Sequence, residues 1–225
     1  VRLLGVTEAL VFAAQMLNFP VAAGTSGHLI GAALASVLLG PAAAVVAMTA
    51  VLLLQSLMFA DGGLTALGAN VLNLALIAPL VAHAVYRVVR SVAGVGLQGT
   101  LLAAGFAAWC STLAAALACA AQLAASGVAD WGTVLPAMGG VHMMIGLGEA
   151  VITMLIVAVV ARARPELVMP GQPAGRRGRT LAWGAVLTVA AMILVAPFAS
   201  PLPDGLEHVA ERFGFARRAL AGQPA

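Results

Sequence analysis

Long apolar runs, separated by short polar or glycine-rich stretches, dominate the chain. Runs that approach the roughly 20 residues of a membrane-spanning helix lie at Leu3–Ala22, Pro41–Phe59, Ala66–Tyr86, Gly99–Ala124, Pro136–Ala161 and Leu181–Phe198. One further run, His28–Leu39, has only twelve residues and would rise about 18 Å as a helix. The pattern predicts an all-α fold, a polytopic transmembrane helical bundle. It would have a six-span core with one short span, plus one added C-terminal span.

The basic residues indicate how these runs are oriented. All 11 are Arg, and most lie beside apolar runs, at positions 2, 87, 90, 162, 164, 176, 177 and 179. These positions share one side if every run crosses once, and the positive-inside rule makes that side cytoplasmic. The Arg residues fall on one side of the membrane only if His28–Leu39 also crosses it. Because this run is short, the loop before it must dip inward, which predicts that His28 lies below the outer surface.

Composition supports a membrane location and excludes several classes. The chain is 62% hydrophobic and 8% charged, whereas soluble domains carry about 25% charged residues. We therefore expect a multi-pass protein of the inner (plasma) membrane, in contact with the lipid bilayer. A net charge of +3 and 5% aromatic residues do not suggest a nucleic-acid partner. Cys110 and Cys119 would face opposite sides of one helix, which predicts free thiols.

Residues 162–180 are rich in Pro, Gly and Arg, which is typical of a flexible linker. The predicted organisation is a transmembrane core at 1–161, a cytoplasmic linker at 162–180, and an accessory helix with its following segment at 181–225.

His28 is the first candidate for chemistry, within Thr25-Ser26-Gly27-His28. Imidazole is a good ligand for divalent cobalt, nickel, copper or zinc. A glycine-rich polar stretch at membrane depth survives only where it is packed in protein or lines a cavity. Spacing alone leaves two alternatives open, a metal ligand or a His that caps a helix at the interface. The sequence contains no Walker A loop, no His-Glu-x-x-His and no Gly-x-Ser-x-Gly, so we do not expect an enzyme.

Other polar residues within the apolar runs need partners inside the bundle. They are Glu8, Gln15, Asn18, Gln55, Asn70, Asn73, His142 and Glu149. His142 and Glu149 are seven residues apart and share a helix face. They could bond to neighbouring helices or serve function, and their role stays open. His83 lies near the inner Arg residues and is expected at the interface.

Several runs together give a family resemblance. They are Phe12–Pro20, Gly24–Leu29, Leu39–Pro41, Phe59–Asn70 and His142–Thr153. Taken in order, they resemble the substrate-binding subunits of cobalt and nickel energy-coupling-factor transporters, the CbiM/NikM type. Pro203-Asp204-Gly205-Leu206-Glu207 resembles the Pro-Asp-Gly-Leu-Glu segment of the CbiN/NikN accessory subunits. The chain thus looks like a fusion of the two.

The resemblance implies uptake of Co²⁺ or Ni²⁺ as the transported substrate, with no permanent cofactor, in a setting such as cobalamin biosynthesis. It implies a transmembrane coupling protein and ATPase subunits as partners. It assigns His28 as a metal ligand, with Thr25, Ser26 and Asn70 supporting the ligand or fixing its loop. The alternative is a subunit of this type for a small organic vitamin.

Two questions stay open at this point. The choice between cobalt and nickel is not decided by ligand chemistry. The family's N-terminal Met-His segment has no counterpart in the printed sequence, so we expect that both ends are trimmed. A chain without that segment would bind metal weakly, and restoring it would raise the affinity by orders of magnitude.

Overall fold

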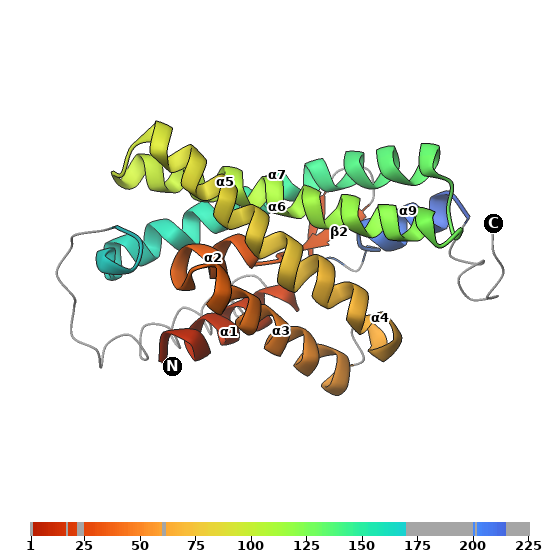
Figure 1. Ribbon diagram of the computed structural model, residues 1–225, viewed down its shortest axis with the longest axis horizontal. Coiled ribbons are helices and arrows are strands. Elements are labelled where there is room, and N and C mark those ends of the chain that lie inside the picture. The colour runs from red at the N-terminus through yellow and green to blue at the C-terminus, as the bar shows by residue number, and fades with distance from the viewer. Residues whose placement is uncertain are drawn as a thin grey trace.

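The fold is a bundle of long helices with a short hairpin packed against its side (Figure 1). The computed structural model describes residues 2–16, 18–21, 25–59, 62–169, 200 and 202–214. The predicted linker beyond residue 169 and the added span at 181–198 lie outside these residues. The elements are α1 (Arg2–Gln15), β1 (Asn18–Val21), β2 (Thr25–His28), α2 (Ala32–Leu39), α3 (Pro41–Met58), α4 (Gly63–Asn70), the π-helix η2 (Val71–Ile77), α5 (Ala78–Ala93), α6 (Leu97–Ala125), α7 (Trp131–Ala163), the 3₁₀ helix η3 (Pro165–Leu167) and α9 (Gly205–Arg212).

Four helical stretches among the described residues have the length and composition to cross a membrane. They are Pro41–Met58, Gly63–Ala93, Leu97–Ala125 and Trp131–Ala163. Each contains most of a predicted apolar run, and the last three extend beyond the predicted ends. The chain is a multi-pass membrane protein with a helical bundle fold, as the apolar pattern predicts.

The first predicted run is wrong as a continuous helix, whereas the second is short, as expected. Helix α1 ends at Gln15, and the chain continues into strand β1 rather than helix as far as residue 22. Pro20 lies in that strand and lacks the N–H that a helix interior needs. Helix α2 has 8 residues and rises only about 12 Å. The all-α prediction therefore has one exception, an antiparallel β1–β2 hairpin between two short helices.

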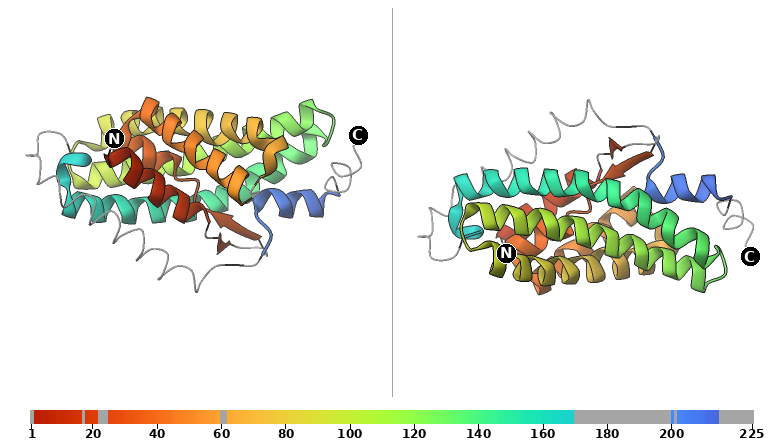
Figure 2. Two further views of the ribbon diagram at one scale, coloured as in Figure 1. Left: turned by 90° about the horizontal axis from the view of Figure 1, so that it is seen from below. Right: turned by 90° about the horizontal axis from the view of Figure 1, so that it is seen from above.

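The Arg-bearing helix ends gather at one end of the bundle. Figures 1 and 2 show the N-terminal end of α1, the α5–α6 connection and the end of α7 on the same side. Arg87 and Arg90 belong to α5, while Arg162 belongs to α7 and Arg164 follows it directly. This is the grouping that the positive-inside argument predicts.

Close packing between the long helices comes from small side chains. Helix α6 buries mostly Ala, Gly, Ser and Thr, which lets α5 and α7 approach closely. At Gly146 in α7, an added Cβ would lie 2.9 Å from Cδ1 of Trp109 in α6. The Trp109 indole N–H also donates to the Met143 carbonyl at 3.0 Å. These contacts hold α6 and α7 together and fix the wall behind the hairpin.

The π-helical segment η2 interrupts the helix that runs from α4 to α5. Pro79 lies two residues after it and cannot donate a backbone hydrogen bond, so the regular ladder is broken at this point. Ser36 of α2 donates its hydroxyl to the Pro79 carbonyl at 2.9 Å. The altered winding carries Asn73, whose side chain is buried. Single turns of π-helix are frequent at functional sites.

Candidate metal site

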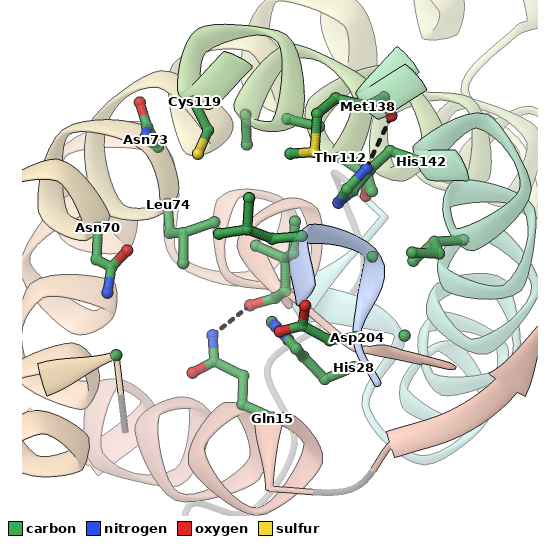
Figure 3. Close-up of a pocket in the computed structure, with 18 of the residues that line it drawn as sticks. Gln15, His28, Asn70, Asn73, Leu74, Thr112, Cys119, Met138, His142 and Asp204 are labelled. Atoms are coloured by element: carbon green, nitrogen blue, oxygen red, sulfur yellow. Dashed lines mark hydrogen bonds between the residues drawn. The ribbon is translucent and has the colours of Figure 1, made fainter. Parts of the chain in front are cut away.

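A polar cavity of 340 Å³ lies between the hairpin and helices α1, α3, α4, α6, α7 and α9. Its polar lining consists of Gln15, His28, Gln55, Asn70, Asn73, Thr112, Cys119, His142, Asp204 and Glu207. Figure 3 shows that these groups enter from elements far apart in the sequence. No described aromatic side chain other than the two imidazoles lines it. His28, which the sequence singled out, therefore lies in a cavity inside the bundle.

The hairpin holds His28 at the cavity. Asn18 pairs with His28 and Val21 pairs with Thr25 across the two strands. At Gly27, an added Cβ would lie 2.6 Å from Cγ2 of Ile145. Strand β2 therefore lies directly on α7, and glycine is needed because the approach is this close. The neighbouring His28 is partly buried.

The backbone after His28 is held from two sides. Gln15 donates Nε2–H to the Ile30 carbonyl at 2.6 Å, and Gly31 donates its N–H to Glu149 Oε1 at 2.9 Å. Thr112 of α6 donates its hydroxyl to Glu149 Oε2 at 2.7 Å. Gly31 adopts a φ of 75°, which favours glycine. A buried carboxylate thus ties the turn that follows His28 to α6 and α7.

The C-terminal segment, residues 202–207, enters the cavity beside the hairpin. Ser26 donates its hydroxyl to the Leu202 carbonyl at 2.7 Å and its backbone N–H to the Pro203 carbonyl at 2.9 Å. Thr25 donates its hydroxyl to the Pro203 carbonyl at 3.1 Å. The Pro-Asp-Gly-Leu-Glu motif therefore packs against the same strand that carries His28.

Asp204 begins helix α9 as its N-cap. Its side chain accepts the Glu207 backbone N–H at 2.8 Å, and the Glu207 side chain accepts the Asp204 backbone N–H at 3.2 Å. This reciprocal pair is a capping box. Asp204 lines the same cavity as His28. The cap thus brings an anionic group to the cavity that holds the imidazole singled out by the sequence.

The three predicted supporting residues have different surroundings. Thr25 and Ser26 are buried, and their hydroxyls bind the C-terminal segment. Asn70 lines the cavity, and its amide packs against the backbone of Gly62. Their role in supporting a ligand stays a prediction.

Several cavity residues were visible in the sequence only as polar residues within apolar runs. Asn73 donates Nδ2–H to Gln122 Oε1 at 3.1 Å and accepts Gln122 Nε2–H at 2.7 Å. Gln55 is 3% exposed, and its Nε2 has no hydrogen-bond partner among the described residues. The sequence showed that these positions are polar, but it did not show that their side chains line the same cavity as His28. For Asp204 the sequence offered only the Pro-Asp-Gly-Leu-Glu motif.

The described residues supply an incomplete set of metal donors. No group of three or more His, Cys, Asp or Glu side chains among them is arranged to hold one ion. His28 is nevertheless an imidazole held in a polar cavity, and imidazole suits nickel and cobalt. The arrangement can contribute a nitrogen ligand to a divalent cation and surround it with amide groups that bond to coordinated water.

Known proteins resemble the chain along most of its length. It is 40% identical over 197 residues to a putative fused nickel transport protein NikMN of Archaeoglobus fulgidus, covering 87% of this chain and 62% of that protein. It is 34% identical to the fused nickel transport protein NikMN of Rhodobacter capsulatus, covering 98% and 68%. The chain thus spans less than two thirds of the first relative's length.

A solved structure and a family description agree with these relatives. The crystal structure of a truncated transition metal transporter superposes with a TM-score of 0.61 at 36% identity, covering 71% of this chain and 79% of that one. Residues 1–167 match the family described as the cobalt uptake substrate-specific transmembrane region, CbiM. The hairpin, His28 and the cavity lining other than residues 204–207 fall within that stretch. The chain therefore belongs to the CbiM family of membrane transporter components.

Proposed function

We propose that this chain is the membrane-embedded, metal-binding subunit of a nickel or cobalt importer, with His28 as a ligand of the transported ion. One observation carries the proposal: His28, which belongs to the stretch that matches the cobalt uptake family, lines a cavity with many polar side chains. The relatives named for nickel transport support the same substrate class. The ion is cargo rather than a resident cofactor.

Hydrogen bonds that fix the backbone just after His28 support a ligand role for its imidazole. A metal-binding imidazole needs a fixed orientation, which neighbouring hydrogen bonds provide. Here Gln15 and Glu149 fix the two residues after Leu29 through the Ile30 carbonyl and the Gly31 N–H. The Asp204 and Glu207 carboxylates in the same cavity lining favour a cation over an anionic ligand.

The organic-vitamin alternative has less support. Flat heterocyclic vitamins bind well against aromatic faces, and the described lining of the cavity contains no Phe, Tyr or Trp. Its amide and imidazole groups instead suit a hydrated divalent cation. We therefore retain metal transport as the single proposed function.

We further propose that import is driven by ATPase subunits that act through a transmembrane coupling protein. The Arg-rich end of the bundle would face the cytoplasm and these subunits. Residues 162–180 would serve as the linker to an accessory segment at 181–225.

Metal uptake by cells that express the full-length protein with its partner subunits tests the proposal. Radioactive Ni²⁺ and Co²⁺ are supplied separately to wild type, His28→Gln and His83→Gln. His83 lies on α5 outside the described cavity lining, so it serves as the matched control. We expect His28→Gln to abolish uptake and His83→Gln to retain it. Equal uptake by the two variants would refute the ligand assignment.

A further inference from the structure

His142 faces the same cavity as His28, and one of its ring nitrogens is already bonded. Nδ1 lies 2.8 Å from the Met138 carbonyl, one turn earlier in α7. Because a carbonyl only accepts, Nδ1 must carry a proton. In the neutral ring Nε2 then presents its lone pair, and no described residue forms a hydrogen bond with it.

This pattern is the one that metal-binding histidines use. Such a histidine usually donates its other ring N–H to a carboxylate, a backbone carbonyl or water, which fixes the tautomer and the ring. In Figure 3 the His142 ring extends from the Met138 carbonyl into the cavity. His28 and Asp204 line the same cavity.

The C-terminal segment covers the coordinating edge of this ring. An added Cβ at Gly205 would lie 2.7 Å from His142 Cε1 and 3.0 Å from Nε2. Only a glycine fits there without displacement. The segment is held to strand β2 by the Ser26 hydroxyl and backbone N–H. Residues 202–207 therefore both bind strand β2 and cover the coordinating edge of the His142 ring.

We propose that His142 is a ligand at a second, weaker site for the divalent cation, which becomes accessible when residues 202–207 leave the cavity. We treat the site as separate from the one at His28 because Gly205 lies against the coordinating edge of the His142 ring in this structure. This inference rests on the proposed function, since it concerns the same cation in the same cavity.

Equilibrium dialysis of Ni²⁺ against the untagged full-length protein in lipid nanodiscs tests the second site. The comparison uses His28→Gln, His28→Gln/His142→Gln and His28→Gln/His83→Gln. Glutamine at 142 can still donate to the Met138 carbonyl, so the helix contact is kept while the imidazole lone pair is lost. We expect His28→Gln to retain a weak site. Adding His142→Gln should weaken it by at least about tenfold, and adding His83→Gln should not.

The two double variants decide the inference. Equal Ni²⁺ binding by them overturns it, and so does a His28→Gln protein that binds no Ni²⁺. The proposed function fails by a different result, namely wild-type affinity in His28→Gln. Gel filtration and thermal unfolding confirm that each variant is folded.

A second measurement weakens the contact between residues 202–207 and strand β2. In the His28→Gln background, Ser26→Ala removes the hydroxyl that bonds to Leu202, whereas Ser126→Ala changes an exposed serine in the α6–α7 turn. Loss of one hydrogen bond raises the open population about fivefold. We therefore expect Ser26→Ala to tighten the weak Ni²⁺ site by about that factor and Ser126→Ala to leave it unchanged. No tightening, or weaker binding, would contradict a site covered by this segment.

Discussion

Glu149 Oε1 accepts the Gly31 backbone N–H at 2.9 Å, across 118 residues of chain. Glu149 is fully buried in α7, and Gly31 immediately precedes α2. This bond joins the turn that follows His28 to helix α7. It gives the carboxylate a structural role that its position in an apolar run left open.

Replacing Glu149 by Ala should destabilise the bundle and loosen His28. The Gly31 N–H would lose its buried acceptor, at a cost of about 1–3 kcal/mol, whereas the Thr112 hydroxyl keeps the Ala108 carbonyl at 3.0 Å. Glu149→Gln keeps an oxygen for Gly31 and an amide that can donate to the Thr112 hydroxyl, so it should lose much less. Thermal unfolding in nanodiscs and Ni²⁺ affinity measure both effects. Equal losses in the two variants would contradict this role.

Replacing Ser26 by Ala should loosen the C-terminal segment without unfolding the core. The variant loses the 2.7 Å bond to the Leu202 carbonyl and keeps the backbone bond to Pro203. Loss of one hydrogen bond costs about 1 kcal/mol. Hydrogen exchange at residues 205–212 should therefore rise severalfold, while exchange in α6 and α7 stays unchanged. Ser126→Ala is the control, and unaltered exchange in Ser26→Ala would count against the contact.

Gly27→Ala should push strand β2 away from α7. The new Cβ would lie 2.6 Å from Ile145 Cγ2, and overpacking of this kind costs about 1–3 kcal/mol. We expect lower stability and weaker Ni²⁺ binding, since His28 is the next residue. Gly140→Ala is the control, because an added Cβ there meets nothing within 4 Å.

The double variant Gly27→Ala/Ile145→Ala identifies the cause of that loss. Ile145→Ala removes Cγ1 and Cγ2 and leaves room for the alanine at 27. If the strand–helix contact is responsible, the two substitutions should be non-additive. The double variant should then regain part of the Ni²⁺ affinity that Gly27→Ala loses. Additive losses in this double-mutant cycle would point to a different cause.

Asn73→Leu should destabilise the cavity wall because the Gln122 amide loses its hydrogen-bond partner. The two amides exchange both hydrogen bonds. Gln122 is only partly buried, so the loss should lie at or below the cost of a fully buried unpaired group, about 1–3 kcal/mol. The variant Asn73→Leu/Gln122→Leu removes both partners and should recover much of the loss. Unfolding temperatures of the two single variants and the double variant measure this coupling. A double variant as unstable as the sum of the singles would exclude it.

The hydrophobic pattern located the long helices well. A helix such as Leu97–Ala125 satisfies its own backbone hydrogen bonds in lipid, so twenty apolar residues suffice to predict it. The same rule failed at Leu3–Ala22 because apolar character does not distinguish a helix from a short strand. Asn18 and Pro20 lie where the helix ends. In the sequence they were visible only as a polar residue and a proline, and they did not predict a strand.

Local motifs named His28 and predicted an inward loop before α2. They did not reveal that Glu149 and Gln15 would hold the turn after His28. Nor did they show that Ser26 would bind the carbonyls of Leu202 and Pro203. Glu149 lies 118 residues from Gly31, and Gln15 lies 15 residues from Ile30. Leu202 and Pro203 lie 176 and 177 residues from Ser26. Spacing along one helix carries no information about such pairs.

By itself the sequence determined that this is a multi-pass helical membrane protein, which end of the bundle carries the arginines, and which imidazole interrupts the apolar pattern. Those properties follow from composition and local periodicity, because lipid penalises every unpaired backbone group. Only the tertiary structure decided which polar groups meet. The cavity forms where α1, α6, α7 and residues 202–207 converge, and that convergence depends on close approaches at Gly27 and Gly205 that only the packed helices create.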